Sequence, residues 1–97
     1  MLYTINKSPL SSTNLASLLR IAPAGEPILL YEDGVYAALA GAASEGMLRQ
    51  ALAQHAVYAL GADLQARGIV RVVDGVRVIG YDGFVELVEQ HDVVPWL

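Results

Sequence analysis

The chain of 97 residues contains no cysteine. Disulfide bonds, thiolate metal ligands and a nucleophilic thiol are therefore excluded within this chain. Histidine is also scarce, and neither His55 nor His91 has a carboxylate or thiolate at a metal-ligand spacing. Both are interpreted as surface or helix-end side chains. No Gly-rich phosphate-binding fingerprint and no Ser-His-Asp pattern accompanies them, so no catalytic, cofactor-binding or metal-binding residue is predicted.

The sequence also contains few basic residues and no long apolar run. Six Lys and Arg stand against ten Asp and Glu, which gives a net charge of −4, and no basic stripe is present. Direct nucleic-acid binding by the chain alone is therefore not expected. The apolar runs are far shorter than the ~20 residues of a membrane span, and the first ten residues do not resemble a signal peptide. We expect a cytoplasmic protein.

Apolar residues are abundant overall. They make up 55% of the chain, and the mean hydropathy is +0.43. A domain of this size has a high ratio of surface to volume and cannot bury so much apolar area by itself. This composition predicts that part of the apolar surface is covered by other subunits.

The most informative stretch runs from Pro27 to Ala40. Residues 28–31 form a short apolar run that is typical of a strand covered on both faces. Glu32-Asp33-Gly34 is predicted to be an acidic turn, and the Ala-rich segment from Val35 is predicted to begin a helix. A strand, a turn and a helix start in this order mark the carboxyl end of an open α/β sheet, where ligands or partners gather.

Similar units flank this stretch. The pattern predicts one domain, residues 1–97, with a mostly parallel sheet of four to five strands in a three-layer α/β/α sandwich. Ser44 and Asp82 are predicted N-caps of the third and last helices. The expected strands are 2–5, 28–31, 57–60 and 76–79, with 93–97 extended, and the expected helices begin near residues 15, 35, 44, 63 and 82.

The segment Val70–Val78 allows two interpretations. Apolar runs on both sides of Asp74-Gly75 are typical of a β-hairpin. Alternatively, the first run crosses the end of the sheet and only the second is a strand. The sequence leaves both open.

Three polar or aromatic groups are candidate sites. Residues 11–14, Ser-Ser-Thr-Asn, supply either helix N-caps or an anion site like that of flavodoxin-like proteins. Glu32 and Asp33 are either turn carboxylates bonded to backbone amides or an acid/base pair. Trp96 covers the sheet edge or anchors an interface, and Tyr36 is a second candidate anchor.

Five segments, in order, carry a resemblance to a known family. They are MLYTINKSP, YEDGVYAALAG, VYALGADLQARG, VIGYDGFVELVEQH and the terminal Trp96-Leu97. Together they cover nearly the whole chain, which is identified as resembling the DsrH/TusB family.

This resemblance implies a DsrEFH-like fold and a small cytoplasmic subunit of a heterohexamer with DsrE/TusD-like and DsrF/TusC-like subunits. Such complexes pass persulfide sulfur, in dissimilatory sulfur oxidation or toward 2-thiouridine at the tRNA wobble position, through a cysteine of the DsrE/TusD subunit and onward to a sulfur carrier. Leu18 occupies the position of a cysteine found in some family members. A chain without a thiol cannot accept a persulfide, so a non-catalytic role without a cofactor is expected.

The interface with the partners is predicted at the central turn and the C-terminal tail. A small flavodoxin-like protein that binds an anion or nucleotide, and a stand-alone homo-oligomeric relative, are the alternatives. The predicted interface residues are Asp33, Gly34, Val35, Tyr36, Trp96 and Leu97.

Overall fold

The computed structural model describes residues 1–97, which form a five-stranded sheet in the order β4-β3-β2-β1-β5. All four pairs of neighbouring strands are parallel, which confirms the predicted α/β class. The strands are β1 (Leu2–Ile5), β2 (Ile28–Leu30), β3 (Val57–Leu60), β4 (Arg77–Ile79) and β5 (Val93–Trp96).

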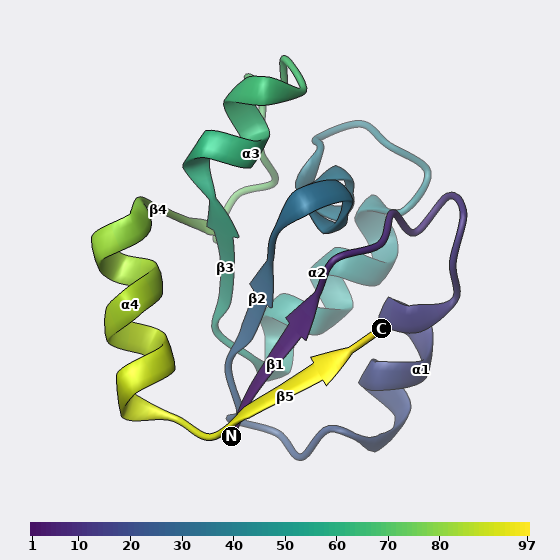
Figure 1. The fold of residues 1–97 in the computed structure, drawn as a ribbon. Helices are drawn as coiled ribbons and strands as arrows, with labels where there is room; N and C mark the ends of the chain where they lie inside the picture. Colours follow the sequence, from purple (N-terminus) through teal and green to yellow (C-terminus); the bar gives the residue numbers. More distant parts are fainter.

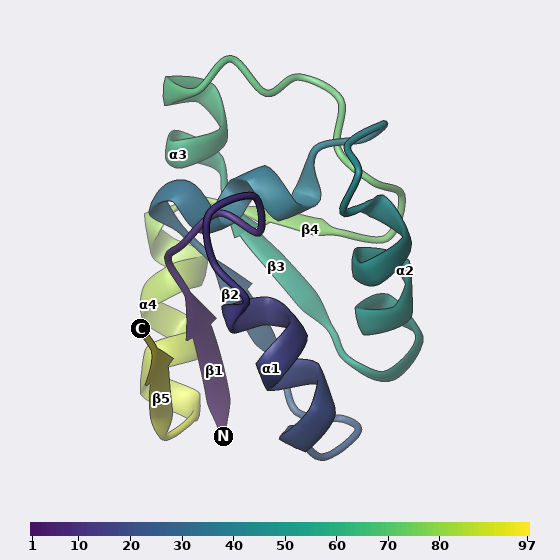
Figure 2. The same cartoon turned by 90° about the vertical axis from the view of Figure 1, so that its right-hand side faces the viewer.

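Helices cover both faces of this sheet (Figure 1). The helices α1 (Asn14–Ile21) and α2 (Glu45–Gln54) lie on one face, and α4 (Tyr81–Gln90) lies on the other, as Figure 2 shows from the side. The 3₁₀ helix η1 (Glu32–Ala38) and α3 (Gly61–Ala66) lie at the end where the strands finish. None of these helices has the length and apolar character needed to cross a membrane.

The two faces bury unequal cores. A cluster of 17 buried residues lies mainly between the sheet and α1, α2 and η1. The opposite cluster contains only Leu2, Leu29 and Leu87, with Phe84 of α4 packed against it. All three residues of β2 are fully buried because successive side chains point to opposite covered faces.

The last strand reverses the direction in which the sheet grows. The chain adds β2, β3 and β4 on one side of β1, and α4 then carries it across the other face to place β5 against the free side of β1. The sheet therefore ends in β4 at one edge and β5 at the other. Pro95 lies in β5 and offers no backbone N–H.

The interpretation of Val70–Val78 as a hairpin is wrong. Val72 forms only an isolated antiparallel bridge with Leu39, and β4 pairs in parallel with β3. The N–H of Val73 donates to the carbonyl oxygen of Ala38 at 2.9 Å, and Asp74-Gly75 then turns the chain into β4. The first apolar run thus crosses the sheet end.

Several predicted helix starts were also wrong in detail. The helix expected from Val35 begins at Glu32 and is 3₁₀ over its seven residues. The predicted N-cap of α2 at Ser44 is confirmed, although its buried hydroxyl has no hydrogen-bond partner. The N-cap of α4 is Gly80, so Asp82 lies inside the first turn. Tyr31, expected at the end of β2, is the N-cap of η1.

Candidate interaction surface at the carboxyl edge of the sheet

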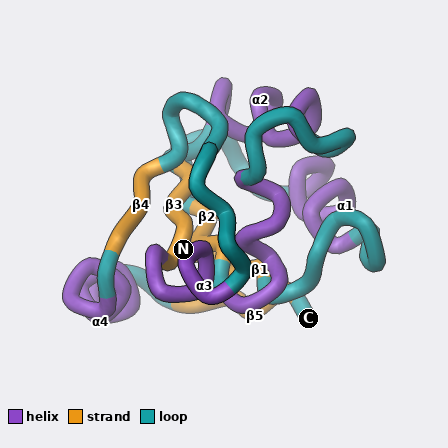
Figure 3. Tube along the Cα trace, turned by 90° about the horizontal axis from the view of Figure 1, so that it is seen from above, coloured by secondary structure: helices purple, strands orange, loops and turns teal.

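The parallel sheet brings the ends of all its strands to one edge. The carboxyl ends of β2, β1 and β5 are neighbours there, because these strands are adjacent in the sheet. Figure 3 looks down on the molecule from this side, where η1 and α3 lie. The predicted turn and the predicted tail, far apart in sequence, are therefore at the same edge.

A network of polar contacts fastens η1 to α3 at this edge. The N–H of Glu32 donates to Asp63 Oδ2 at 2.6 Å. Arg67 Nε donates to Asp33 Oδ1 at 2.9 Å, and its Nη1 lies 3.7 Å from Asp63 Oδ1. The backbone φ of Glu32 is +48°, an unusual value for a residue with a side chain.

This network explains the acidic residues of the central turn. Asp33 is paired with the Arg67 guanidinium, and the Glu32 backbone is held by Asp63. The arrangement is that of a structural brace, in which the carboxylates of Asp33 and Asp63 both contact the Arg67 guanidinium. Glu32 contributes its backbone N–H to the brace and not its carboxylate. Sequence reasoning missed both Asp63 and Arg67, although their i, i+4 spacing is a known pairing signal within a helix.

Close packing fixes the middle of the turn. A Cβ atom added to Gly34 would lie 2.1 Å from the carbonyl oxygen of Ile5, so η1 touches the end of β1 directly. Gly34 and Val35 are buried within the chain. Of the predicted interface residues in this segment, only Asp33 and the half-buried Tyr36 reach the surface.

The tail is fastened to β1 and α1. The rings of Trp96 and Tyr3 meet edge to face, with centroids 6.3 Å apart. Asn14 Nδ2 donates to the carbonyl oxygen of Trp96 at 3.2 Å. Trp96 is half-buried and packs against the main core, whereas Leu97 beyond it is 71% exposed.

The polar residues 11–14 hold the chain rather than surround a cavity. Ser12 Oγ accepts a hydrogen bond from the N–H of Asn14 at 3.1 Å, and the Asn14 side chain reaches β5. None of the three pockets of the molecule is lined by these residues. Thr13, one of the N-cap candidates in residues 11–14, is the N-cap of α1 and makes no side-chain capping bond.

An exposed leucine completes this edge. Leu10, in the loop between β1 and α1, is 77% exposed. Sequence reasoning missed it, and its only signal is an apolar residue placed between Pro9 and a run of polar residues. We call Leu10, Asp33, Tyr36, Trp96 and Leu97 the carboxyl-edge surface.

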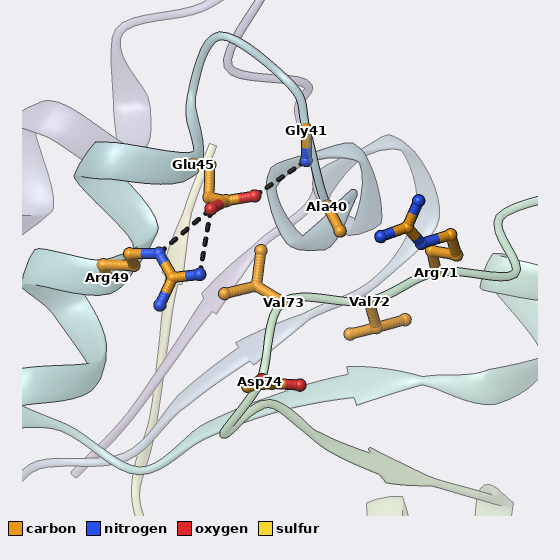
Figure 4. Close-up of a pocket in the computed structure, with 8 residues that line it drawn as sticks. All are labelled: Ala40, Gly41, Glu45, Arg49, Arg71, Val72, Val73 and Asp74. Carbon is orange, nitrogen blue, oxygen red and sulfur yellow. Dashed lines mark hydrogen bonds and ion pairs between the residues drawn. The ribbon is translucent and has the colours of Figure 1, made fainter.

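The largest polar pocket lies beside α2 (Figure 4). It has a volume of about 430 Å³ and is lined by two acidic and two basic side chains, Glu45, Asp74, Arg49 and Arg71. Glu45 Oε1 accepts from the N–H of Gly41 at 2.7 Å, and Arg49 pairs with the other oxygen at 3.0 Å. The bond from Gly41 and then that from Arg49 hold the pKa of Glu45 below its ordinary value. The charges of the four side chains sum to zero, so the lining as a whole carries no net charge.

The two histidines and Leu18 lie at positions where they support the fold. His55 is buried at the end of α2, and its Nδ1 lies 2.7 Å from the carbonyl oxygen of Glu26. His91 is the C-cap of α4, and no group of three metal-ligating side chains occurs. Leu18 is fully buried in the main core.

Fold and surface together define a small three-layer α/β protein with an all-parallel sheet, a braced carboxyl edge and exposed apolar side chains at that edge. The sequence profile of a family described as DsrH like protein matches residues 7–94, and the chain belongs to this family.

Individual relatives agree with this assignment. The chain is 46% identical over 92 residues to Protein TusB of Serratia proteamaculans (strain 568), and 41% identical to Protein TusB of Escherichia coli O1:K1 / APEC. Each alignment covers 94% of this chain and 94% of the relative. Among solved structures, the ychN protein from E. coli superposes with a TM-score of 0.84 at 23% identity, covering 97% of this chain and 96% of that one, which supports the fold alone.

Proposed function

We propose that this chain is a non-catalytic subunit of a sulfur-relay complex, in which related subunits carry persulfide sulfur on cysteine. Its partners are a DsrE/TusD-like and a DsrF/TusC-like subunit in a heterohexamer, and a downstream sulfur carrier receives the sulfur. The observation that carries this proposal is membership of the DsrH-like family by a chain that has no cysteine. A thiolate is required to accept and pass on sulfane sulfur, so the reacting atoms belong to a partner.

The carboxyl-edge surface is the proposed contact with these partners. Leu10 and Leu97 are 77% and 71% exposed, and Tyr36 and Trp96 are half-buried. Aromatic side chains are enriched among the residues that carry the binding energy of protein interfaces, and covering exposed aliphatic side chains adds apolar burial. The brace between η1 and α3 holds this surface in shape without a partner, because its polar contacts are all within the chain.

The tRNA branch is the favoured pathway. The similar proteins of Serratia and Escherichia are named TusB, and the TusB branch of the family is the one that passes sulfur toward 2-thiouridine. The net charge of −4 disfavours direct contact with tRNA, so we propose that this chain supports the relay at a step before the tRNA. Loss of 2-thiouridine from tRNA in a strain that lacks this chain, measured by mass spectrometry of nucleosides, tests this branch.

Co-expression tests the complex directly. The chain is produced with the two related subunits of its own organism, with an affinity tag on the cysteine-bearing subunit. We expect a stoichiometric complex for the wild type and at least about tenfold less co-purified chain for Leu10→Asp/Leu97→Asp. Covering one large aliphatic side chain contributes about 1.5–3 kcal/mol, which corresponds to that factor or more.

Ile21→Asp is the matched control. Ile21 is 63% exposed at the end of α1, which runs back from the carboxyl edge, so its change should leave co-purification intact. If the double variant assembles like the wild type, the contact lies elsewhere on the chain. Absence of the wild-type chain from the material captured by the tagged subunit contradicts the proposed function itself.

A further inference from the structure

The helix α4 presents an apolar stripe that the chain does not cover. Phe84 and Leu87 pack against the second core cluster and hold the helix to the sheet. Tyr81, Val85 and Val88, spaced i, i+4 and i+7, are 65%, 52% and 38% exposed. Residues at this spacing share one side of a helix. The helix therefore has two apolar sides, of which this fold uses one.

The same helix carries an acidic stripe. Asp82, Glu86 and Glu89 repeat the i, i+4, i+7 spacing one residue later, so this stripe lies next to the exposed apolar one. All three side chains are exposed, and none takes part in an ion pair within the chain.

The charge of the whole molecule is concentrated here. From Val78 to Leu97 the sequence contains four carboxylates and no Lys or Arg, while the rest of the chain holds six acidic and six basic residues. The net charge of −4 therefore belongs entirely to α4, β5 and their connections. The nearest arginine in sequence, Arg77, is held 5.7 Å above the ring of Tyr58.

The exposed apolar surface follows the same distribution. Six of the ten exposed large apolar side chains lie within residues 78–97. After α4 the chain passes into β5, where Val93 is 41% exposed, and Figure 1 shows these two elements joined at the base of the molecule. An apolar area bordered by charges of one sign is the pattern of an interface that selects its partner.

We propose that this side of α4, the α4 face, binds a basic protein partner through an aliphatic ridge flanked by Lys or Arg side chains. The α4 face consists of Tyr81, Asp82, Val85, Glu86, Val88 and Glu89. Its valines and Tyr81 supply the apolar contact, and its carboxylates attract and orient a positively charged surface. A second copy of the chain using the same face is opposed by like charges, and nucleic acid is repelled by the carboxylates.

This inference does not depend on the proposed function, because the α4 face shares no residue with the carboxyl-edge surface. A basic subunit of the relay would satisfy both proposals. A basic partner outside the relay would satisfy this one alone.

Photo-crosslinking in the producing cell identifies the partner. The change Val85→p-benzoylphenylalanine places a crosslinker in the centre of the α4 face, and mass spectrometry identifies the attached protein. The same change at Val70, which is 89% exposed in the segment after α3, is the control. We expect one discrete product from position 85 that is absent at position 70. No product, or attachment to a second copy, overturns the proposal.

Binding of the identified protein, purified and measured by calorimetry, then tests the chemistry. We expect Glu86→Lys/Glu89→Lys to weaken binding at least about tenfold and to reduce its dependence on salt. Val85→Ser/Val88→Ser should weaken binding by a similar factor at every salt concentration. The matched controls Asp74→Lys and Val70→Ser change an exposed carboxylate and an exposed valine outside the face and should leave the Kd within twofold. Unchanged binding by both double variants, or an attached protein with an acidic contact surface, ends the proposal.

Discussion

Leu18 lies in α1 with its side chain wholly inside the main core. A cysteine at this position would meet the apolar side chains of the sheet and its neighbours, out of reach of a donor or acceptor in solution. Burial in apolar surroundings also raises the pKa of a thiol and removes its nucleophilic form. A sulfur-carrying role for this position would therefore need the start of α1 to open.

The change Leu18→Cys tests this point. We expect its thiol to react with Ellman's reagent only under conditions that unfold the protein, because the folded core excludes the reagent. Leu10→Cys is the control, and its thiol should react at once because Leu10 is 77% exposed. Equal rates for the two variants in the folded state would mean that α1 opens readily.

Two glycines with opposite surroundings give a second prediction. Gly34→Ala should lower the free energy of unfolding by about 2 kcal/mol, because its Cβ would meet the backbone oxygen of Ile5 at 2.1 Å. Gly46→Ala, in α2 with open space around it, should raise that free energy by up to about 1 kcal/mol. Urea denaturation of both proteins measures the pair, and two changes of the same sign would show that Gly34 tolerates a side chain.

At the level of secondary structure, Glu45, the first residue of α2, ties the helix start to the loop before it. Its carboxylate accepts the N–H of Gly41 and pairs with Arg49, and these two contacts hold the pKa of Glu45 below its ordinary value. A carboxylate whose pKa is lower in the folded state stabilises the fold above its unfolded pKa. That stabilisation is lost as the pH falls through the folded value.

Glu45→Gln should therefore lower the free energy of unfolding at pH 7. The difference from the wild type should shrink as the pH falls below the ordinary range of a glutamate and vanish at more acidic values. Denaturation curves at a series of pH values provide the measurement. A difference that is constant from pH 7 to pH 3 would mean that the carboxylate charge plays no part in the contacts with Gly41 and Arg49.

The strands were predictable from local sequence, but η1 was not. The run Ile28–Leu30 is apolar at every position, and burial on both faces follows directly from that pattern. The Ala-rich residues after Gly34 favour an α-helix, yet the contact between Gly34 and Ile5 presses this segment against the end of β1. That contact joins residues distant in sequence, so local propensity could not reveal it.

The polar brace was hidden for the same reason. Asp33 and Arg67 are separated by 34 positions, and nothing in either segment indicates the other. The sequence indicated the central turn and the tail as candidate contacts with partners, but it could not place the two segments at one edge of the sheet. It could not show that Val35 faces inward while Leu10 faces outward, because both are apolar residues next to a turn.

For the molecule as a whole, the predicted surplus of apolar surface has a definite location. Ten large apolar side chains are exposed, gathered mainly on residues 78–97 and on the carboxyl-edge surface. A patch of this kind on a small domain promotes association when its partners are absent. The acidic α4 face opposes that association through charge repulsion, which salt screens.

Light scattering of the isolated chain tests this balance. We expect the average mass to rise with protein concentration and to rise further with salt, because screening weakens the repulsion between acidic faces. Leu10→Asp/Leu97→Asp should shift the rise to higher concentration by removing two exposed leucines. A mass that stays at that of one chain at every concentration and salt level would contradict the predicted need for subunit contacts.

The two edge strands of the sheet differ in their free backbone donors, and this difference limits how copies of the chain can join by strand pairing. At β4 the outer peptide groups meet no further strand, whereas Pro95 removes a donor from β5. A fibril continues to grow only if each added molecule exposes another edge strand that can pair with the next molecule. Two copies that pair through their β4 edges leave only the two β5 edges exposed, and the proline in each of these disfavours the addition of a third copy.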